Sequence, residues 1–314
     1  MRRLKEDEMR VKALAIGVAC AVALCGPASA TTIGASISHF DENFLTLIIG
    51  AMKAEAQRTG TTIAFEDAAG DTDRQISQVQ NFVSQHVDAI VVNAVDSSAT
   101  RKMTEAATAA HIPLVYVNRG PDGAALPAGV SFVSSDEHVS GRLQGEALAK
   151  LLGGKGNVVI MEGELSDQAT RLRTEGVVKV AAEHPGMKVI AVQPADYSRS
   201  KAIDLMNNWL STGDHIDAVA ANNDEMAIGA ILALQGARVD PRSVVVAGVD
   251  ATPDGLAEMA KGRLAVTVFQ DAKSQGRVAV DTALRMARGE TVPNHVDVPF
   301  ELVTPDNMNS YVGR

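Results

Sequence analysis

Short apolar runs recur along the chain without the alternation of apolar and polar positions that a half-exposed strand shows. In the first half these runs have the length of β-strands and cover Thr32–Ser38, Thr61–Phe65, Ala89–Asn93 and Pro113–Val117. Segments with helical spacing separate them, as in the series Ile76, Val79, Phe82 and Val83. After Asp136 the pattern starts again, with runs at Asn157–Met161, Lys188–Gln193, Asp217–Ala221, Val244–Gly248 and Leu264–Phe269. The chain therefore predicts two successive sets of βαβ units.

Continuous runs of Val, Ile and Ala are typical of parallel strands that helices cover on both faces. The short crossovers favour doubly wound sheets, so we predict an α/β fold with two doubly wound parallel-sheet lobes that join near Ser134 and Ser135. Thr72, Asp96 and Thr252 are predicted as helix caps, Thr252 being followed by a proline at the first helical position.

The first 30 residues have the features of a secretory signal peptide. An apolar run, Ala13–Cys25, is followed by Gly26–Ala30, a segment of mostly small residues that is typical of a signal-peptide cleavage site. A membrane anchor needs about 20 apolar residues, and this run has only 13. We predict cleavage near Ala30, so that Thr31 begins the mature chain, and translation could start at Met1 or at Met9.

Both cysteines, Cys20 and Cys25, lie in this segment, so the mature chain needs no oxidative folding. A lipoprotein signal requires a small residue directly before the acylated cysteine and a leucine three residues before it. Leu24 breaks the first condition for Cys25, and Gly17 breaks the second for Cys20. We therefore predict a free periplasmic protein, and we expect a monomer.

Composition narrows the classes of function. The 314 residues include 38 acidic and 29 basic side chains, a net charge of −9, and without the first 30 residues the counts are 35 and 24, a net charge of −11. This balance, with no Lys/Arg-rich block, disfavours nucleic acid and other phosphate-rich partners. No run of 18 apolar residues follows residue 30, which disfavours a membrane-embedded protein.

Enzyme motifs are missing from the sequence. It has no G-x-S-x-G, no H-E-x-x-H, no Walker loop and no G-x-G-x-x-G after a predicted strand, and Gly153–Gly156 precedes a strand instead. Asp250 and Asp254 are four residues apart but have binding and helix-start roles. The seven histidines lack ligand spacing, so we predict no enzyme, no metal and no cofactor.

In an open parallel sheet, ligands bind beyond the carboxyl ends of the strands, where helix N-termini present unpaired N–H groups. The predicted strand ends carry amides, carboxylates and guanidinium groups: Ser38 to Glu42, Asn118, Arg119, Tyr197, Arg199, Asn222 to Glu225, Asp250 and Gln270. Planar, paired donors and acceptors of this kind match the adjacent hydroxyls of a neutral polyhydroxylated ring. Phe44 and Tyr197 lie beside strand ends, where an aromatic face can pack on such a ring.

Three segments resemble the ribose-type branch of the periplasmic sugar-binding proteins. They are Gln193–Tyr197, Asn222–Ala230 and Gly248–Gly255, and the resemblance extends from about Ile33 to Val303. It implies the type I fold of that family, with a hinge that closes two lobes on a sugar and an inner-membrane ABC permease that receives it. Chain crossings are then expected near Ser135, Gln270 and Val298.

The resemblance also implies the division of the chain and the contacts of the ligand. Residues 31–135 with 271–298 would form the N-terminal lobe, and residues 136–270 with 299–314 the C-terminal lobe. By position in the motifs, the N-terminal lobe would bind the ligand through Ser38, Glu42, Phe44, Leu45, Asn118 and Arg119. The C-terminal lobe would bind it through Arg173, Tyr197, Asn223, Asp250 and Gln270.

Two departures from the ribose-type pattern concern the ligand. Asp41–Leu45 stands where that pattern has Asn-Asn-Pro-Phe-Phe, and Asn118-Arg119 stands where it has Asp-Arg. Glu42 reaches further than Asn, and Asn118 gains donors that Asp lacks, so the hydroxyl pattern to be bound differs. The sequence resembles the inositol-binding members, and we predict myo-inositol, with ribose second and xylose or a hexose after it. The calcium loop of the galactose-binding relatives is absent.

Other interpretations of single residues remain open at this point. Asn223 and Asp250 could be cap or turn residues, Glu42 could be an exposed residue at a helix start, and Arg171 competes with Arg173 for the inward position. A repressor of the same fold carries a helix-turn-helix module before the first strand, and this chain has a predicted signal peptide there. A receptor that feeds a sensor instead of a permease would show the same sequence features.

Overall fold

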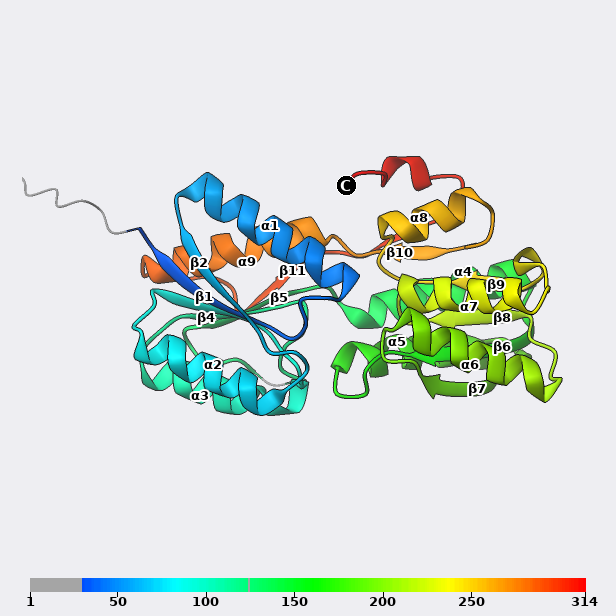
Figure 1. The fold of residues 1–314 in the computed structure, drawn as a ribbon, viewed down its shortest axis with the longest axis horizontal. Helices are drawn as coiled ribbons and strands as arrows, with labels where there is room; N and C mark the ends of the chain where they lie inside the picture. Colours follow the sequence, from blue (N-terminus) through cyan, green and yellow to red (C-terminus); the bar gives the residue numbers. More distant parts are fainter. Residues whose placement is uncertain (1–29, 124) are drawn as a thin grey trace, which may run out of the picture. The chain divides into compact units, whose positions relative to one another are not determined.

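The computed structural model describes residues 30–123 and 125–314, and Thr31–Arg314 form one compact unit (Figure 1). The predicted signal peptide falls on residues 1–30 and, apart from Ala30, lies outside the described residues. Among the helices of the described part, none combines the length and the apolar character that crossing a bilayer would take.

The first lobe is built on a parallel sheet of six strands in the order β11-β5-β4-β3-β1-β2. The strands are β1 (Thr32–Ile37), β2 (Thr62–Asp67), β3 (Ala89–Asn93), β4 (Leu114–Val117), β5 (Val130–Ser134) and β11 (His295–Asp297). One face is covered by α1 (Asn43–Thr59) and α9 (Ala272–Ala287), and the other by α2 (Thr72–Ser84) and α3 (Thr100–Ala109), as Figure 1 shows.

Successive residues of a central strand enter two different cores, which explains the continuous apolar runs. In β3, Ala89 and Val91 belong to the core beneath α1 and α9. Ile90 and Val92 belong to the core beneath α2 and α3. The predicted α/β class, with parallel sheets covered on both faces, is confirmed.

The second lobe has a four-stranded parallel sheet in the order β7-β6-β8-β9. Its strands are β6 (Lys155–Glu162), β7 (Gly186–Pro194), β8 (Ala218–Ala221) and β9 (Val245–Ala247). Its helices are α4 (Glu137–Leu152) and α5 (Gln168–Glu183) against one core, and α6 (Arg199–Thr212), α7 (Asp224–Gly236) and α8 (Pro253–Ala260) against the other. In both lobes the strands therefore end next to the starts of covering helices.

A third, smaller sheet lies beside the second lobe. Here β10 (Thr267–Phe269) pairs antiparallel with β12 (Glu301–Val303). The predicted run Leu264–Phe269 is therefore a strand over only three residues, and its ladder partner is antiparallel. The sequence pattern did not predict β5, β11 or β12, because β5 carries serines and the other two strands have three residues each.

Three short 3₁₀ helices complete the described part of the chain: η1 (Ser97–Ala99), η2 (Pro241–Ser243) and η3 (Met308–Ser310). The chain passes from one lobe to the other between β5 and α4, between β10 and α9, and between β11 and β12.

Two of the three predicted caps are confirmed and one is wrong. The Asp96 carboxylate accepts from the Ser98 N–H at 2.7 Å, and the Thr252 hydroxyl accepts from the Gly255 N–H at 3.1 Å. Thr72 is instead the first residue of α2, and Asp71 is its cap. Asp71 has the better geometry because its carboxylate reaches the N–H three residues ahead, on Arg74.

Candidate ligand-binding site

The carboxyl ends of strands from both lobes surround one small polar cavity. Ten of the eleven predicted site residues line it: Glu42, Phe44, Leu45, Asn118, Arg119, Arg173, Tyr197, Asn223, Asp250 and Gln270. Asp167 and Ala169 complete the lining. Seven carboxylate, amide or guanidinium groups from the predicted set thus converge, together with the Tyr197 hydroxyl.

The cavity has the size of a single ring. The centre of a water molecule can occupy about 30 Å³ of it. Because the walls lie a further ~1.4 Å away, the enclosed space is on the order of 150 Å³ if it is compact. That space suits one saturated ring with its substituents and is too small for a disaccharide.

Ser38, the eleventh predicted residue, lies behind the cavity wall. It is fully buried, and its hydroxyl donates to Oδ1 of Asn93 at 2.6 Å. Nδ2 of Asn93 in turn lies 3.3 Å from Oδ1 of Asn118, and Nη1 of Arg119 lies 3.5 Å from the Ser38 hydroxyl. Ser38 therefore supports two lining residues without lining the cavity itself.

Arg119 is the centre of an ion-pair cluster between the lobes. Its Nη2 lies 2.6 Å from Glu42 of the first lobe, and its Nη1 lies 2.8 Å from Glu164 of the second. Its Nε lies 3.4 Å from Asp167, and its guanidinium carbon stands 5.1 Å from the centre of the Tyr197 ring. The Arg119 side chain is 6% exposed, so water has little access to these contacts.

The cluster shifts the pKa values of its members in opposite directions. Burial raises the pKa of Glu42, and the positive charge of Arg119 only partly offsets this. Burial also acts to raise the pKa of Glu164, but a hydrogen bond from His39 and the charge of Arg119 outweigh it, so that pKa is lowered. Burial would lower the pKa of Arg119, and its carboxylate partners more than compensate.

His39, Glu42 and Glu164 lie close enough together to hold a metal ion. Nε2 of His39 is 3.3 Å from Glu164 and 3.9 Å from Glu42. Arg119 already donates to both carboxylates, so the arrangement favours an ion-pair cluster over a set of metal ligands.

Arg173 is held rigidly inside the second lobe. Its Nε and Nη2 donate to the two carboxylate oxygens of Glu137 at 2.6 and 2.9 Å, and its Nη1 donates to the Asn222 carbonyl at 2.7 Å. Arg171, the competing residue, is half exposed and pairs with Asp122 on the surface. The structure therefore places Arg173 and not Arg171 at the cavity.

Tyr197 and Asn223 are fixed by their local backbone. Tyr197 has a left-handed backbone with φ +55°, and its hydroxyl donates to Asp167 at 3.0 Å. A Cβ at Gly163 would overlap the Tyr197 ring, so glycine is required there. Asn223 caps α7 by accepting from the Met226 N–H at 2.9 Å, and it also lines the cavity. Asn223 can therefore cap the helix and line the cavity at the same time.

Asp250 faces the cavity from a strained turn after β9. Its φ is +112°, and the next residue, Ala251, also has a positive φ of +52°. Its side chain is 3% exposed and lies 4.0 Å from Nη1 of Arg173. Burial raises the pKa of Asp250 well above its ordinary value, although Arg173 acts to lower it.

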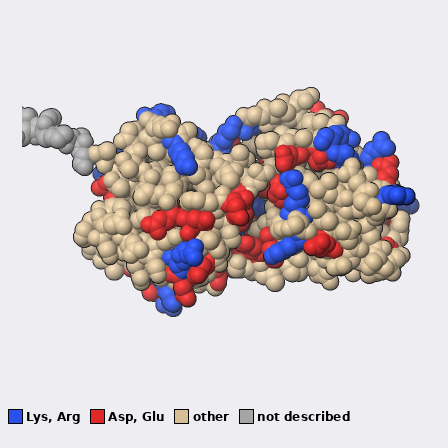
Figure 2. Space-filling model, in the orientation of Figure 1, with Lys and Arg blue, Asp and Glu red and all other residues tan. Residues whose placement is uncertain are grey.

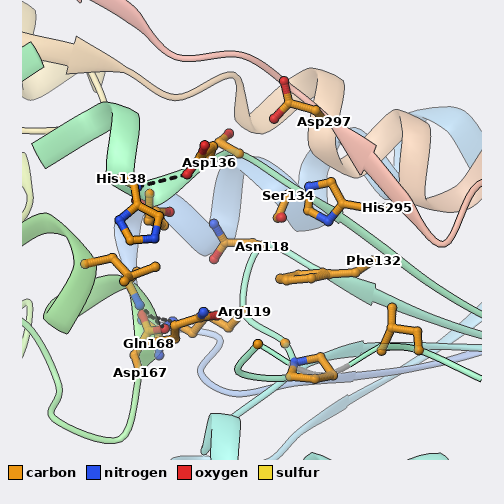
Figure 3. A pocket seen from close by; sticks show the side chains of 18 of the residues that line it. Asn118, Arg119, Phe132, Ser134, Asp136, His138, Asp167, Gln168, His295 and Asp297 are labelled. Atoms are coloured by element: carbon orange, nitrogen blue, oxygen red, sulfur yellow. Dashed lines mark hydrogen bonds and ion pairs between the residues drawn. The ribbon is translucent and has the colours of Figure 1, made fainter. Parts of the chain in front are cut away.

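Larger hollows lie on both sides of this cavity. A groove of about 620 Å³ shares Asn118, Arg119 and Asp167 with the cavity and continues to Phe132 and His295 (Figure 3). A groove of about 540 Å³ on another side includes His39 and Glu225 among its lining residues. These wide grooves suit solvent and access paths, whereas the small cavity collects the converging polar groups.

Glu137, Glu164 and Asp167 were missed by the sequence reasoning. Glu164 and Asp167 follow the end of β6, where the rule applied to the other strand ends would have found them. Glu137 begins α4 directly after β5, a strand that the apolar pattern did not reveal. Trp209 is 6% exposed and belongs to the core of the second lobe.

Comparisons with known proteins agree with this architecture. The family described as "Periplasmic binding protein domain" matches residues 33–291. A putative rhizopine-binding protein of Rhizobium meliloti is 47% identical over 308 residues, covering 97% of this chain and 100% of the relative. The ribose import binding protein of Escherichia coli is 32% identical, covering 94% and 99%.

A solved structure is similar over most of the chain. It is an ABC transporter solute-binding protein from Bacillus halodurans with bound myo-inositol. The two proteins are 46% identical, with a TM-score of 0.87, and the match covers 91% of this chain and 98% of the other.

Proposed function

This chain belongs to the family of periplasmic binding proteins, and from that premise we propose that it is the solute-binding component of an ABC importer with myo-inositol as its ligand. Ribose is the second candidate, because ribose import binding proteins are among its relatives at 32% identity. The protein would act by binding and not by catalysis, in the periplasm, as a monomer that delivers its ligand to an inner-membrane permease.

The observation that supports this function most strongly is the shared cavity. Side chains from both lobes line a space of single-ring size, and most of them are planar groups with paired donors or acceptors. Two adjacent ring hydroxyls match such a pair, because each hydroxyl both donates and accepts. The 46% identical protein from Bacillus halodurans with bound myo-inositol supports the same class of ligand.

In this proposal the lobes close on the ligand, because the residues that line the cavity are divided between them. In this proposal residues 31–135 with 271–298 move against residues 136–270 with 299–314, because α9 packs in the first lobe and β12 pairs with β10 beside the second. Each lobe supplies about half of the lining, so the closed arrangement satisfies the ligand better than either lobe does alone. Ligand then shifts the equilibrium by its differential affinity for the closed form, which the permease would recognise.

Glu42 and Asn118 are the proposed adaptations to a six-membered ring. Glu42 fixes Arg119 by an ion pair at 2.6 Å, so its first effect is to orient that guanidinium toward the cavity. Asn118 has a left-handed backbone with φ +62°, a conformation that Asn tolerates better than most residues. Its amide offers donors at a position where the ribose-type pattern has only carboxylate acceptors.

Thermal unfolding with a panel of ligands tests the proposal. The full chain is expressed with its N-terminal segment, purified from the periplasm and stripped of bound ligand by unfolding and refolding. Myo-inositol at about 100 times its Kd should stabilise the protein by about 2.7 kcal/mol. Ribose, xylose, glucose and galactose at the same concentration should stabilise it less, because they bind more weakly. A dominant effect of ribose would keep the fold and the cavity but overturn the role given to Glu42 and Asn118. Mass spectrometry of the same sample tests cleavage before Thr31.

A further inference from the structure

Leu165, in the loop between β6 and α5, has the most exposed large apolar side chain among the described residues, at 70%. The residues on both sides of it are nevertheless held by the first lobe. Glu164 lies 2.8 Å from Nη1 of Arg119. The carbonyl of Ser166 accepts from the Ser97 N–H at 3.1 Å. The leucine is therefore fixed between two contacts with the opposite lobe, so a partner could bury its side chain at little cost in conformational entropy.

A second exposed apolar side chain, Phe40, lies on the first lobe beside the same contact. Phe40 is 37% exposed and directly follows His39 in the sequence. Nε2 of His39 lies 3.3 Å from Glu164, the residue before Leu165. One apolar residue from each lobe thus stands next to a contact between the lobes. Opening of the lobes would break that contact and separate the two residues, so in the proposed closure they come together only in the closed form.

The loops of the first lobe next to Phe40 are acidic. The Gly70 N–H donates to the Ser38 carbonyl at 2.9 Å, so the loop after β2 lies beside the loop that carries Phe40. Residues 38–43 and 67–74 contain a single arginine and five acidic residues, which are Asp41, Glu42, Asp67, Asp71 and Asp73. Figure 2 shows acidic side chains on the first lobe up to its boundary with the second. A protein that binds to these loops would complement them with basic side chains.

We propose that Phe40, Leu165 and the two acidic loops, residues 38–43 and 67–74, form a docking surface for the permease, which would bind there through a segment with apolar and basic side chains. This inference rests on the proposed function and specifies the partner surface. Neither Phe40 nor Leu165 lines the ligand cavity. Because each lobe supplies one of the two apolar side chains, the permease would contact both at once only on the closed protein. Docking would thus depend on bound ligand without touching it.

The apolar and acidic parts of the docking surface would contribute differently. A fixed apolar side chain that becomes buried in an interface contributes much of the binding free energy and slows dissociation. Acidic residues around it mainly speed the encounter with a basic partner, and salt screens that attraction. Loss of the Leu165 side chain should therefore weaken docking more than neutralisation of two exposed aspartates does.

Uptake of radiolabelled myo-inositol by cells of the source organism tests the docking surface, with each variant replacing the chromosomal gene and a deletion strain giving the baseline. Leu165→Ser should lower uptake by about tenfold or more at a ligand concentration far above the Kd, because it removes the buried centre of the interface. Phe40→Ser should lower uptake as well. Calorimetry on the purified variants should give a Kd for myo-inositol within about twofold of the wild-type value, since neither side chain lines the cavity.

Leu151→Ser is the matched control. Leu151 is 52% exposed in the last turn of α4, at the opposite end of that helix from Glu137, and uptake should match that of the wild type. Asp71→Asn combined with Asp73→Asn should lower uptake by a smaller factor, about two- to fivefold. Asn at position 71 keeps a side chain that can cap α2. Equal uptake in the Leu151→Ser and Leu165→Ser strains would overturn the inference, and unchanged uptake in the double variant would overturn the basic partner.

The outcomes distinguish this inference from the function on which it rests. If the wild-type protein does not bind myo-inositol, or if deletion of its gene leaves uptake unchanged, the proposed function fails. If uptake depends on the protein and Leu165→Ser supports it fully, only the docking surface fails. A Kd weakened in proportion to the loss of uptake would also overturn the docking surface, because Leu165 would then act on ligand binding.

Discussion

Two buried arginines at the cavity differ in where their partners lie. Arg173 is paired within its own lobe, by a bidentate contact with Glu137. Arg119 is paired across the lobes, because Glu42 comes from the first lobe whereas Glu164 and Asp167 come from the second. Both arginine side chains are at least 94% buried, so neither depends on water for its main contacts.

This difference indicates different tasks for the same side chain. The ion pair of Arg173 requires no contribution from the first lobe, so in the proposed closure this arginine is positioned before the lobes meet. Two of the three carboxylates around Arg119 belong to the opposite lobe, so its cluster would be complete only in the closed form. We therefore propose that the second lobe offers a preformed half-site and that the Arg119 cluster responds to closure.

The largest expected effect comes from breaking the pair inside the second lobe. Arg173→Leu leaves the buried carboxylate of Glu137 without its cation and should lower the free energy of unfolding by about 3–5 kcal/mol. Arg171→Leu, two residues away, removes only exposed ion pairs and should change it by less than about 0.5 kcal/mol. Urea denaturation of both variants measures the difference. Equal losses of unfolding free energy in the two variants would show that the buried ion pair with Glu137 stabilises the protein no more than the exposed ion pairs do.

Breaking the pair between the lobes should act on closure more than on folding. Arg119→Leu leaves Glu42, Glu164 and Asp167 facing one another, and the unliganded protein should shift toward the open form by on the order of 1–3 kcal/mol. Small-angle X-ray scattering should give a larger radius of gyration than for the wild type. An unchanged radius for Arg119→Leu would remove the distinction drawn between the two arginines.

A smaller effect is expected from crowding the tyrosine beside the cluster. Gly163→Ala places a Cβ against the Tyr197 ring and should cost about 1–3 kcal/mol of stability together with a loss of myo-inositol affinity. Gly50→Ala is the control, because no atom lies within 4 Å of its added Cβ and it should stabilise α1 by about 0.5–1 kcal/mol. Calorimetry of both variants tests this, and unaltered affinity in Gly163→Ala would argue against a role for Tyr197 in binding.

The smallest effect concerns pH. A hydrogen bond to Glu164 raises the pKa of His39 above its usual value of 6.5, although burial opposes it. Stability from this contact is therefore fully present below about pH 6.5 and is lost as the pH rises through the raised value. Between about pH 6 and pH 8, the wild type should lose more stability than His39→Gln in urea denaturation. The reverse order would mean that His39 is not protonated beside Glu164.

Much of this arrangement could be predicted from the sequence. The apolar runs predicted the sheet type because a strand covered on both faces, such as β3, buries every residue. The strand-end rule and the family motifs together named ten residues that line one cavity. Both succeed for the same physical reason, since parallel strands in a lobe end at one edge of the sheet.

The features that the sequence did not predict depend on contacts that a local sequence pattern does not show. Glu137, the partner of Arg173, follows β5, and this strand was not predicted because its serines are typical of loops. Ser38 stands directly at a strand end, yet its hydroxyl turns toward Asn93 and not toward the cavity. Among the described residues the Asp250 carboxylate has no hydrogen-bond donor, and the sequence could not predict this because it depends on Arg173 pairing with Glu137 instead.

The central claim is that a polyhydroxylated ring binds in the cavity between the lobes, and titration of Asp250→Ala with myo-inositol tests it most directly. The wild type should bind one ligand per chain, and the variant should lose on the order of 2–4 kcal/mol of binding free energy, about a 30- to 700-fold weaker Kd. Its unfolding without ligand should stay close to that of the wild type, because Asp250 donates or accepts no side-chain hydrogen bond within the described residues. Unchanged affinity in the variant would contradict the account, because the ligand would then bind elsewhere.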